Sequence, residues 1–311
     1  FAGSYNDTTP NDTITASRLL VTSAEASGDI VLSPKATGAF LASLPDDSTT
    51  GGSKRGARAV DLQTLRLAAN EVASGGGATI SGGIYSRASG DYSVVSGGSV
   101  NHATSSHAAI GGGYNNAASG TASTIAGGQQ HTASGDYSTI SGGNNNDATA
   151  TSSFVGGGSS NNATGLNSSI LGGSGNTAAG DYSAIIGGRT LTLDSSADES
   201  AGFLSGTVGM TISAPNTFVL GNADLWLANN DNSTSELRFY EAYNTSGAFP
   251  STAKYTAFKA GSQDADVTYT LPLAAPTADG QVLASTTGGT LSWAANTIAK
   301  AKTADESVTS S

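Results

Sequence analysis

The chain has 311 residues, a formal net charge of −11 and no cysteine. The acidic balance disfavours a nucleic-acid partner, which would require clustered lysine and arginine, and the lack of cysteine excludes a disulfide framework and thiolate metal sites. Charged residues are only 12% of the chain and glycine fills 42 positions, so an ordinary globular composition is also excluded.

Residues 1–78 are expected to form an N-terminal connecting region of mixed structure, with short apolar runs that suit short strands. Apolar side chains recur every three or four positions between residues 59 and 73, which predicts a helix with one narrow seam. The seam consists of Leu62, Leu65, Ala69 and Val72. An irregular β segment is the alternative for these residues.

A 15-residue repeat follows, beginning at residue 79 and continuing to residue 188 without insertion or deletion. Each unit contains a pair of glycines, and a β-branched aliphatic residue stands three positions before the second one. These aliphatic residues are Ile80, Val95, Ile110, Ile125, Ile140, Val155, Ile170 and Ile185. A constant phase is not expected of a disordered low-complexity segment. The repeat therefore predicts a stack of equal coils.

Two further positions recur in each unit. Alanine stands five residues after the glycine pair, and asparagine usually stands three residues after it. The asparagine position comprises Asn101, Asn116, Asn146, Asn161 and Asn176, with Ser86 and His131 as exceptions. Because asparagine tolerates the left-handed conformation, we interpret it as a corner residue. Each coil is thus expected to have two short strands and two corners, with Ile or Val on one strand and Ala on the other pointing inward.

A single coil of this size is expected to enclose too few apolar side chains to be stable by itself. Ordering 15 residues costs on the order of 20 kcal/mol, while one buried Ile or Val returns about 2–3 kcal/mol. The row of Ile and Val is therefore predicted to pack between chains as the core of a homotrimer. The predicted fold class is all-β: a fibrous homotrimer with a parallel β-roll or β-helix of 15-residue coils, followed by a small antiparallel β module.

The repeat domain is expected to cover residues 79–222, with 217–222 as a degenerate capping coil. Residues 223–295 contain more aromatics and short alternating strands punctuated by Pro and Gly, which predicts the antiparallel module. Residues 296–311 are polar and are interpreted as a linker into a further part. The start at Phe1 indicates processing or a segment of a longer chain.

The repeat phrase Ser-x-Ile-x-Gly-Gly-x-x-Asn-x-Ala-x-Gly-x-x-Ser resembles the head repeat of trimeric autotransporter adhesins, the YadA-like left-handed β-roll, over about a third of the chain. The neck, coiled-coil stalk and anchoring barrel usual in that family are not visible in this sequence. The flanking segments 51–63 and 236–293 look like parts of phage tail-fibre-like proteins.

These resemblances imply a structural subunit of a trimeric extracellular fibre. The leading interpretation is a phage tail fibre that attaches to a host surface, and the alternative is a bacterial surface adhesin or extracellular filament subunit. The expected location is the virion surface or the cell exterior. The expected partners are two further copies of the chain and a host-surface glycan or protein, with no membrane-embedded part, cofactor, metal or enzymatic activity.

Three Asp-Tyr-Ser triplets begin at Asp91, Asp136 and Asp181. Their carboxylates would lie three coils apart, about 14 Å, which is too far to share a calcium ion, so we interpret them as solvent-facing turn residues. The tyrosines of these triplets form a possible exposed contact stripe for carbohydrate, with packing over a corner or between chains as the alternative. They are Tyr92, Tyr137 and Tyr182.

The histidines are His102, His107 and His131. A three-fold axis could gather three copies of one histidine around an ion, and hydrogen bonding at a corner is the alternative. No phosphate-binding loop, nucleophile elbow or isolated acid pair occurs in the sequence.

Overall fold

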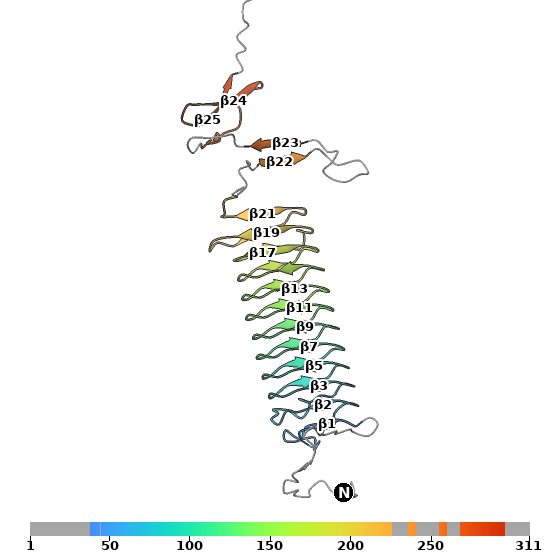
Figure 1. Cartoon of the computed structure of the whole chain (residues 1–311). Coiled ribbons are helices and arrows are strands. Elements are labelled where there is room, and N and C mark those ends of the chain that lie inside the picture. Colours follow the sequence, from blue (N-terminus) through green and yellow to red (C-terminus); the bar gives the residue numbers. More distant parts are fainter. Residues whose placement is uncertain (1–37, 44, 226–235, 241–254, 260–267, 296–311) are drawn as a thin grey trace, which may run out of the picture. The chain divides into compact units, whose positions relative to one another are not determined.

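A computed structural model of the chain describes residues 38–43, 45–225, 236–240, 255–259 and 268–295. The chain divides into two units, Phe1–Leu225 and Trp226–Ser311. The described residues are all-β and include no helix, as the prediction of an all-β class requires (Figure 1). Accordingly, none of these residues forms a helix that is long and apolar enough to cross a membrane.

The first unit is a solenoid of two parallel sheets. Figure 1 shows the strands of the longer sheet as successive rungs. The twelve-stranded sheet contains, in spatial order, β1 (Phe40–Leu41), β2 (Val60–Asp61), β3 (Thr79–Ile80), β5 (Val94–Val95), β7 (Ala109–Ile110), β9 (Thr124–Ile125), β11 (Thr139–Ile140), β13 (Phe154–Val155), β15 (Ser169–Ile170), β17 (Ala184–Gly188), β19 (Ala201–Leu204) and β21 (Phe218–Gly221).

The nine-stranded sheet supplies the other side of each coil. It contains, in spatial order, β20 (Met210–Ile212), β18 (Leu191–Leu193), β16 (Thr177–Ala178), β14 (Asn162–Ala163), β12 (Asp147–Ala148), β10 (Thr132–Ala133), β8 (Ala117–Ala118), β6 (His102–Ala103) and β4 (Arg87–Ala88).

The register of the strands confirms the 15-residue coil. Ile125 pairs with Ile140 on one sheet, and Ala118 pairs with Ala133 on the other. Every coil of the repeat thus contributes one short strand to each sheet, and equivalent residues of successive coils stack on one another. The predicted parallel solenoid with two strands per coil is confirmed.

Four rows of side chains fill the interior. The Ile/Val row of the twelve-stranded sheet and the Ala row of the nine-stranded sheet are buried, as Ile125 and Ala133 illustrate with 0% exposure each. Buried serines precede the Ile/Val row and buried asparagines precede the Ala row; Ser123 and Asn146 are both 0% exposed. The interior is therefore narrow and lined by small side chains next to one branched aliphatic residue per coil.

The prediction that the Ile/Val row packs between chains is wrong. The eight residues are 0 to 1% exposed in a single chain: Ile80, Val95, Ile110, Ile125, Ile140, Val155, Ile170 and Ile185. The coil closes on itself because the facing alanines and flanking serines are small enough for the two sheets to approach. Backbone hydrogen bonds between coils, such as Thr124 N to Ser138 O at 2.9 Å, recur at several points of every coil and add about 1 kcal/mol each.

A ladder of buried side chains adds a stabilising element that the sequence analysis missed. The side-chain oxygen Oδ1 of Asn161 accepts a hydrogen bond from the backbone N–H of Asn176 in the next coil at 3.1 Å. The side-chain nitrogen Nδ2 of Asn161 donates to Gly157 O at 2.9 Å and to Gly173 O at 3.0 Å. The same acceptor role passes along the solenoid through Gln63, Ser86, Asn101, Asn116, His131, Asn146, Asn161 and Asn176, ending at the N–H of Leu191.

The asparagines are thus interior hydrogen-bonding residues, and their interpretation as left-handed corner residues is wrong. The left-handed position is the preceding residue, for example Asn115 at φ 55° and Asn145 at φ 53°. A buried amide satisfies backbone groups at two levels at once, which a solvated corner residue would not do.

The helix predicted over residues 59–73 is also wrong, and the irregular β alternative is confirmed. Val60 and Asp61 form β2, which pairs with β3, so the solenoid begins before residue 79. The polar residues of the segment decide its conformation: buried Asp61 forms ion pairs with Arg55 at 2.8 Å and Arg66 at 3.3 Å. Leu65, from the expected seam, is 54% exposed.

The C-terminal coils of the solenoid depart from the repeat. Successive paired residues are 17 apart at β19 and β21, where Ala201 pairs with Ala184 and with Phe218. Strand β21 is the last rung, as expected for a degenerate capping coil over residues 217–222.

The described residues of the second unit form two antiparallel hairpins, which confirms the predicted small antiparallel module. Strand β22 (Glu236–Tyr240) pairs with β23 (Tyr255–Lys259), and β24 (Gln281–Ser285) pairs with β25 (Leu291–Ala295). The predicted linker over residues 296–311 and the beginning of the connecting region, residues 1–37, lie outside the described residues.

Candidate functional site

Each coil turns at two corners that differ in chemistry. The tyrosine corner follows the nine-stranded sheet and includes residues 90–92 and their equivalents in other coils. The glycine corner follows the twelve-stranded sheet and includes residues 97–100 and their equivalents. Because both corners repeat along the solenoid, each forms an edge on which side chains of successive coils are arranged in rows.

The three tyrosines of the predicted contact stripe all lie at the tyrosine corner. Tyr92, Tyr137 and Tyr182 are 56%, 64% and 59% exposed, and each adopts a positive φ. They are three coils apart, about 14 Å at the usual strand spacing. The stripe is thus accessible along one edge of the single chain, and its role in binding remains a prediction.

The aspartates of the same triplets have a structural role at this corner. The carboxylate of Asp91 accepts the N–H of Gly76 at 2.8 Å, and that of Asp136 accepts the N–H of Thr121 at 2.7 Å. Asp181 and Asp198 each accept an N–H of the preceding coil in the same way. Each carboxylate thus satisfies a backbone donor one coil away, in agreement with the interpretation of the triplets as turn residues.

The three histidines lie in different environments. His102 lies on the outer side of the nine-stranded sheet, His107 stacks on Tyr92 with ring centroids 5.3 Å apart, and His131 occupies the buried ladder with 1% exposure. Burial lowers the pKa of His131 and of His102 below the ordinary value of histidine. In the described part of the chain, no three His, Cys, Asp or Glu side chains are grouped as metal ligands would be.

The glycine corner requires its second glycine. Gly143 has a φ of +96°, and a Cβ at this position would collide with the carbonyl oxygen of Gly158 in the next coil. The corner is also almost free of charge: between residues 82 and 190, its only charged side chain is that of Arg189. This edge therefore carries no acid and one cation near its C-terminal end, and its large side chains, such as Tyr85 and Tyr114, lie toward its N-terminal end.

A recess forms beside Arg189 where the repeat breaks. In the preceding coil, Arg189 and Thr190 alone connect Gly188 to Leu191, whereas residues 205–209 connect the equivalent positions Leu204 and Met210. The loop 205–209 is thus three residues longer than the corner on which it stacks. The resulting recess has a volume of about 460 Å³.

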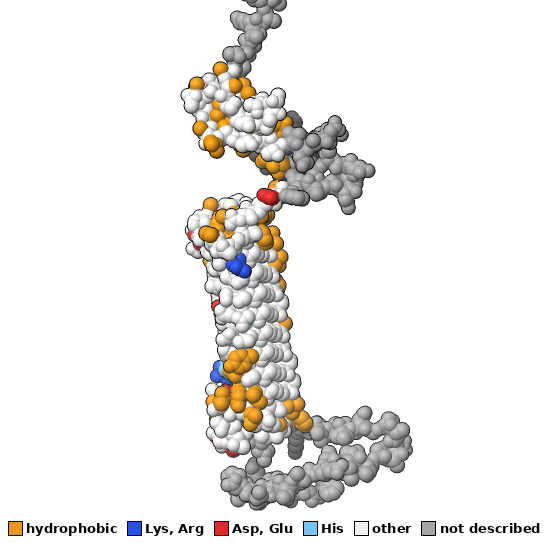
Figure 2. All heavy atoms as spheres, turned by 90° about the vertical axis from the view of Figure 1, so that its left-hand side faces the viewer, with side chains coloured by type: hydrophobic (Ala, Val, Ile, Leu, Met, Phe, Trp, Pro, Cys, Tyr) orange, Lys and Arg blue, Asp and Glu red, His pale blue; other side chains and the backbone are white. Residues whose placement is uncertain are grey.

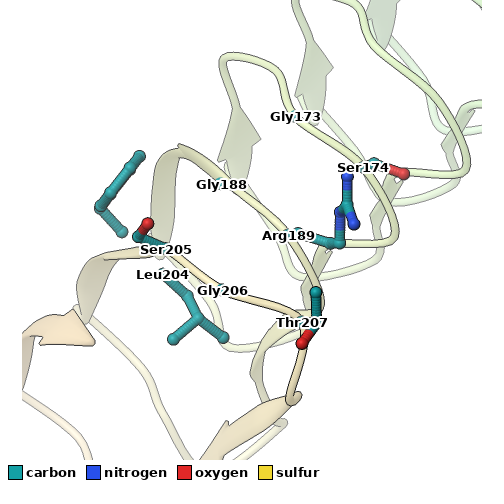
Figure 3. A pocket seen from close by; sticks show the side chains of 9 residues that line it. Gly173, Ser174, Gly188, Arg189, Leu204, Ser205, Gly206 and Thr207 are labelled. Atoms are coloured by element: carbon teal, nitrogen blue, oxygen red, sulfur yellow. The ribbon is translucent and has the colours of Figure 1, made fainter. Parts of the chain in front are cut away.

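Small polar groups and one cation line this recess. Gly173 and Gly188 contribute backbone only, Phe203 contributes a half-buried aromatic ring, and the hydroxyl-bearing residues are Ser174, Ser205 and Thr207. Figure 3 shows the Arg189 side chain directed toward Ser174, with Thr207 on the same side and Ser205 across Gly188. Within the described residues, Arg189 has no ion pair and the three hydroxyls have no hydrogen-bond partner.

The outer surfaces of the two sheets form a second candidate interaction region. On the described strands of the twelve-stranded sheet, no outward position carries a charge. We call this surface the uncharged face; its outward residues are Phe40, Ala42, Val60, Leu62, Thr79, Ser81, Val94, Ser96, Ala109, Gly111, Thr124, Ala126, Thr139, Ser141, Phe154, Gly156, Ser169, Leu171, Ala184, Ile186, Ala201, Phe203, Phe218 and Leu220.

The most exposed large apolar residues of the uncharged face lie toward its C-terminal end. Leu171, Ile186 and Phe218 are 58%, 52% and 63% exposed, and hydrophobic side chains appear along the right-hand edge of the upper solenoid in Figure 2. The outer surface of the nine-stranded sheet, by contrast, carries Arg87 and Asp147 among threonines and serines.

Sequence reasoning found the tyrosine corner but missed the uncharged face and the recess. The uncharged face could have been detected, because its positions keep the period of the repeat and none is charged. The recess had a weaker signal, which was the end of the 15-residue spacing after Gly188 immediately before Arg189.

Comparison with known proteins adds no assignment to these features. No protein-family model matches the chain, and none of the curated proteins matches it in sequence.

Proposed function

We propose that this chain is a structural subunit of a homotrimeric extracellular fibre, with a phage tail fibre that attaches to a host surface as the leading assignment. Three parallel copies are arranged around an axis along the solenoid, in the same register. The contact between copies is the uncharged face, in place of the interior Ile/Val row that the sequence analysis assigned to it.

The observation that carries this proposal is the lack of charge on the twelve-stranded sheet. A chain with a net charge of −11 repels its own copies, so close association requires a surface without charges to desolvate. In a parallel arrangement in register, each apolar residue meets the same residue of its neighbour, so the contacts of Leu171 and Ile186 are shielded from water in every copy.

The second unit supports the same conclusion. Its described residues include Phe239 and Phe258, which are 54% and 71% exposed on the first hairpin, and Leu271, which is 69% exposed outside the hairpin strands. A two-stranded hairpin is only marginally stable by itself. Burial of these side chains against equivalent hairpins of two further copies would supply the missing apolar contacts.

A native mass measurement of the purified full chain tests the assembly. We expect three times the 30.5 kDa mass of one chain at micromolar concentration. A folded single chain under these conditions would contradict the proposal.

The repeat phrase itself favours one alternative, a bacterial surface adhesin or extracellular filament subunit with the same solenoid. Mass spectrometry of purified phage particles and of the washed bacterial envelope separates the two assignments. Peptides of the chain in particles but not in the envelope of uninfected cells support the tail fibre, and the reverse distribution supports the adhesin.

A further inference from the structure

We propose that the recess beside Arg189 binds a carboxylate-bearing sugar of a surface glycan. This proposal rests on the proposed attachment to a host surface, and it adds the chemical class of the receptor. The structural evidence for it is the recess, which forms where the 15-residue repeat ends.

The charge distribution favours one anionic group at this place. Arg189 is the only lysine or arginine between residues 88 and 225, and the glycine corner contains no carboxylate between residues 82 and 190. The neighbouring acids Asp181, Asp198 and Glu199 belong to the tyrosine corner. There the carboxylates of Asp181 and Asp198 accept hydrogen bonds from the preceding coil, and the backbone N–H of Glu199 donates one to it. A carboxylate in the recess would therefore meet a cation and no acid of the same corner.

The shape and polarity of the recess favour a sugar as the carrier of that carboxylate. The planar guanidinium can donate two parallel hydrogen bonds to a carboxylate. The unpaired hydroxyls of Ser174, Ser205 and Thr207 can donate to and accept from the hydroxyl groups of a sugar. The backbone of Gly188 has no side chain to hold the ring away, and Phe203 offers an apolar wall at the border of the uncharged face.

The size of the recess is compatible with this ligand class, because its volume of about 460 Å³ lies in the usual range of small-molecule sites. A polyanion such as a nucleic acid is disfavoured, since one cation cannot neutralise successive phosphates. A single charged sugar requires no second cation.

Calorimetric titration of the full chain in its native assembly tests the proposal. The probes are β-1,4-linked glucuronate oligomers, with glucose oligomers of the same linkage and length as neutral controls. We expect the glucuronate oligomers to bind at least tenfold more tightly. Arg189→Gln removes this difference, and Arg189→Lys retains part of it because the charge remains without the planar fork.

Lys54→Gln is the matched control, because it removes an exposed positive charge far along the chain from the recess and should leave binding unchanged. Equal affinity for both probes, no binding of either, or unchanged binding by Arg189→Gln would each overturn the proposal. Tighter binding of glucose 6-phosphate than of glucuronate would also overturn it, because the recess would then prefer a phosphate to a carboxylate. The native mass of the same samples separates this from the proposed function: a trimer that does not bind contradicts only the recess.

Discussion

The two sheets of the solenoid enclose one interior but present different surfaces outside. Outward positions of the nine-stranded sheet include Arg87, Asp147 and Asp194, whereas those of the twelve-stranded sheet include no charge and end in Ile186 and Phe218. Both sheets follow the same 15-residue period. The period is therefore explained by the interior, which every coil must fill, whereas the outward positions do not fill it and can differ between the two sheets.

The largest expected effect contrasts the two sides of a single strand. Ile125→Asp places a charge in an interior that is 0% exposed, so we expect the solenoid to lose its cooperative unfolding transition, with destabilisation of about 4 kcal/mol or more. Thr124→Asp, on the outer side of β9 and within the uncharged face, should leave each chain folded even where the added charge separates the copies. Circular dichroism during thermal unfolding compares the two, and a similar loss in both would contradict the single-chain interior.

A smaller effect is expected for the asparagine ladder. Asn161→Ala removes the acceptor of Asn176 N–H and the donor to Gly157 O and Gly173 O, which should cost about 2–4 kcal/mol because buried backbone groups lose their partners. Asn162→Ala, on the outer side of β14, is the control and should cost less than about 1 kcal/mol. Chemical denaturation measures both, and equal costs would show that the ladder is not a stabilising element.

The pH dependence of stability should reveal the one histidine in the ladder. Burial lowers the pKa of His131 although the nearby Asp147 acts in the opposite direction, so below about pH 6.5 the unfolded chain binds protons more readily than the folded one. Stability should therefore fall as the pH decreases from 7.5 to 5. The pKa of His102 is lowered as well, by burial and then by Arg87, with the same sign.

His131→Asn restores the usual residue of the ladder and should reduce this decline, leaving the contribution of His102. Melting temperatures of the two proteins at both pH values provide the measurement. If the decline is the same with asparagine at position 131, the ladder does not cause the pH dependence.

The sequence predicted the coil because its determinants are local and repeated. The phase of Ile125 and Ala133 identified the inward positions, and the glycine pairs identified one corner. The sequence did not predict that one chain closes around its own interior, because a buried asparagine and a corner asparagine look alike in sequence. The role of a buried asparagine depends on carbonyl groups 4 and 12 residues away, as the hydrogen bonds of Asn161 to Gly157 and Gly173 show.

The candidate sites were predictable to different degrees. Tyr137 and its equivalents follow the repeat, so their common corner could be inferred. The helix expected near Leu65 failed because Asp61 and Arg66 form a buried ion pair that apolar spacing does not reveal. The recess beside Arg189 depends on a loop three residues longer than its neighbour, and its stacking on that neighbour becomes known only from the register of β18 and β20.

The most direct test of the account is the native mass of two variants in one coil. Leu171 and Thr164 are both exposed and each follows a two-residue strand, but Leu171 lies on the uncharged face and Thr164 on the opposite sheet. We predict that Leu171→Asp yields folded single chains while Thr164→Asp retains the mass of three. Trimers from both variants, or single chains from both, would contradict assembly through the uncharged face.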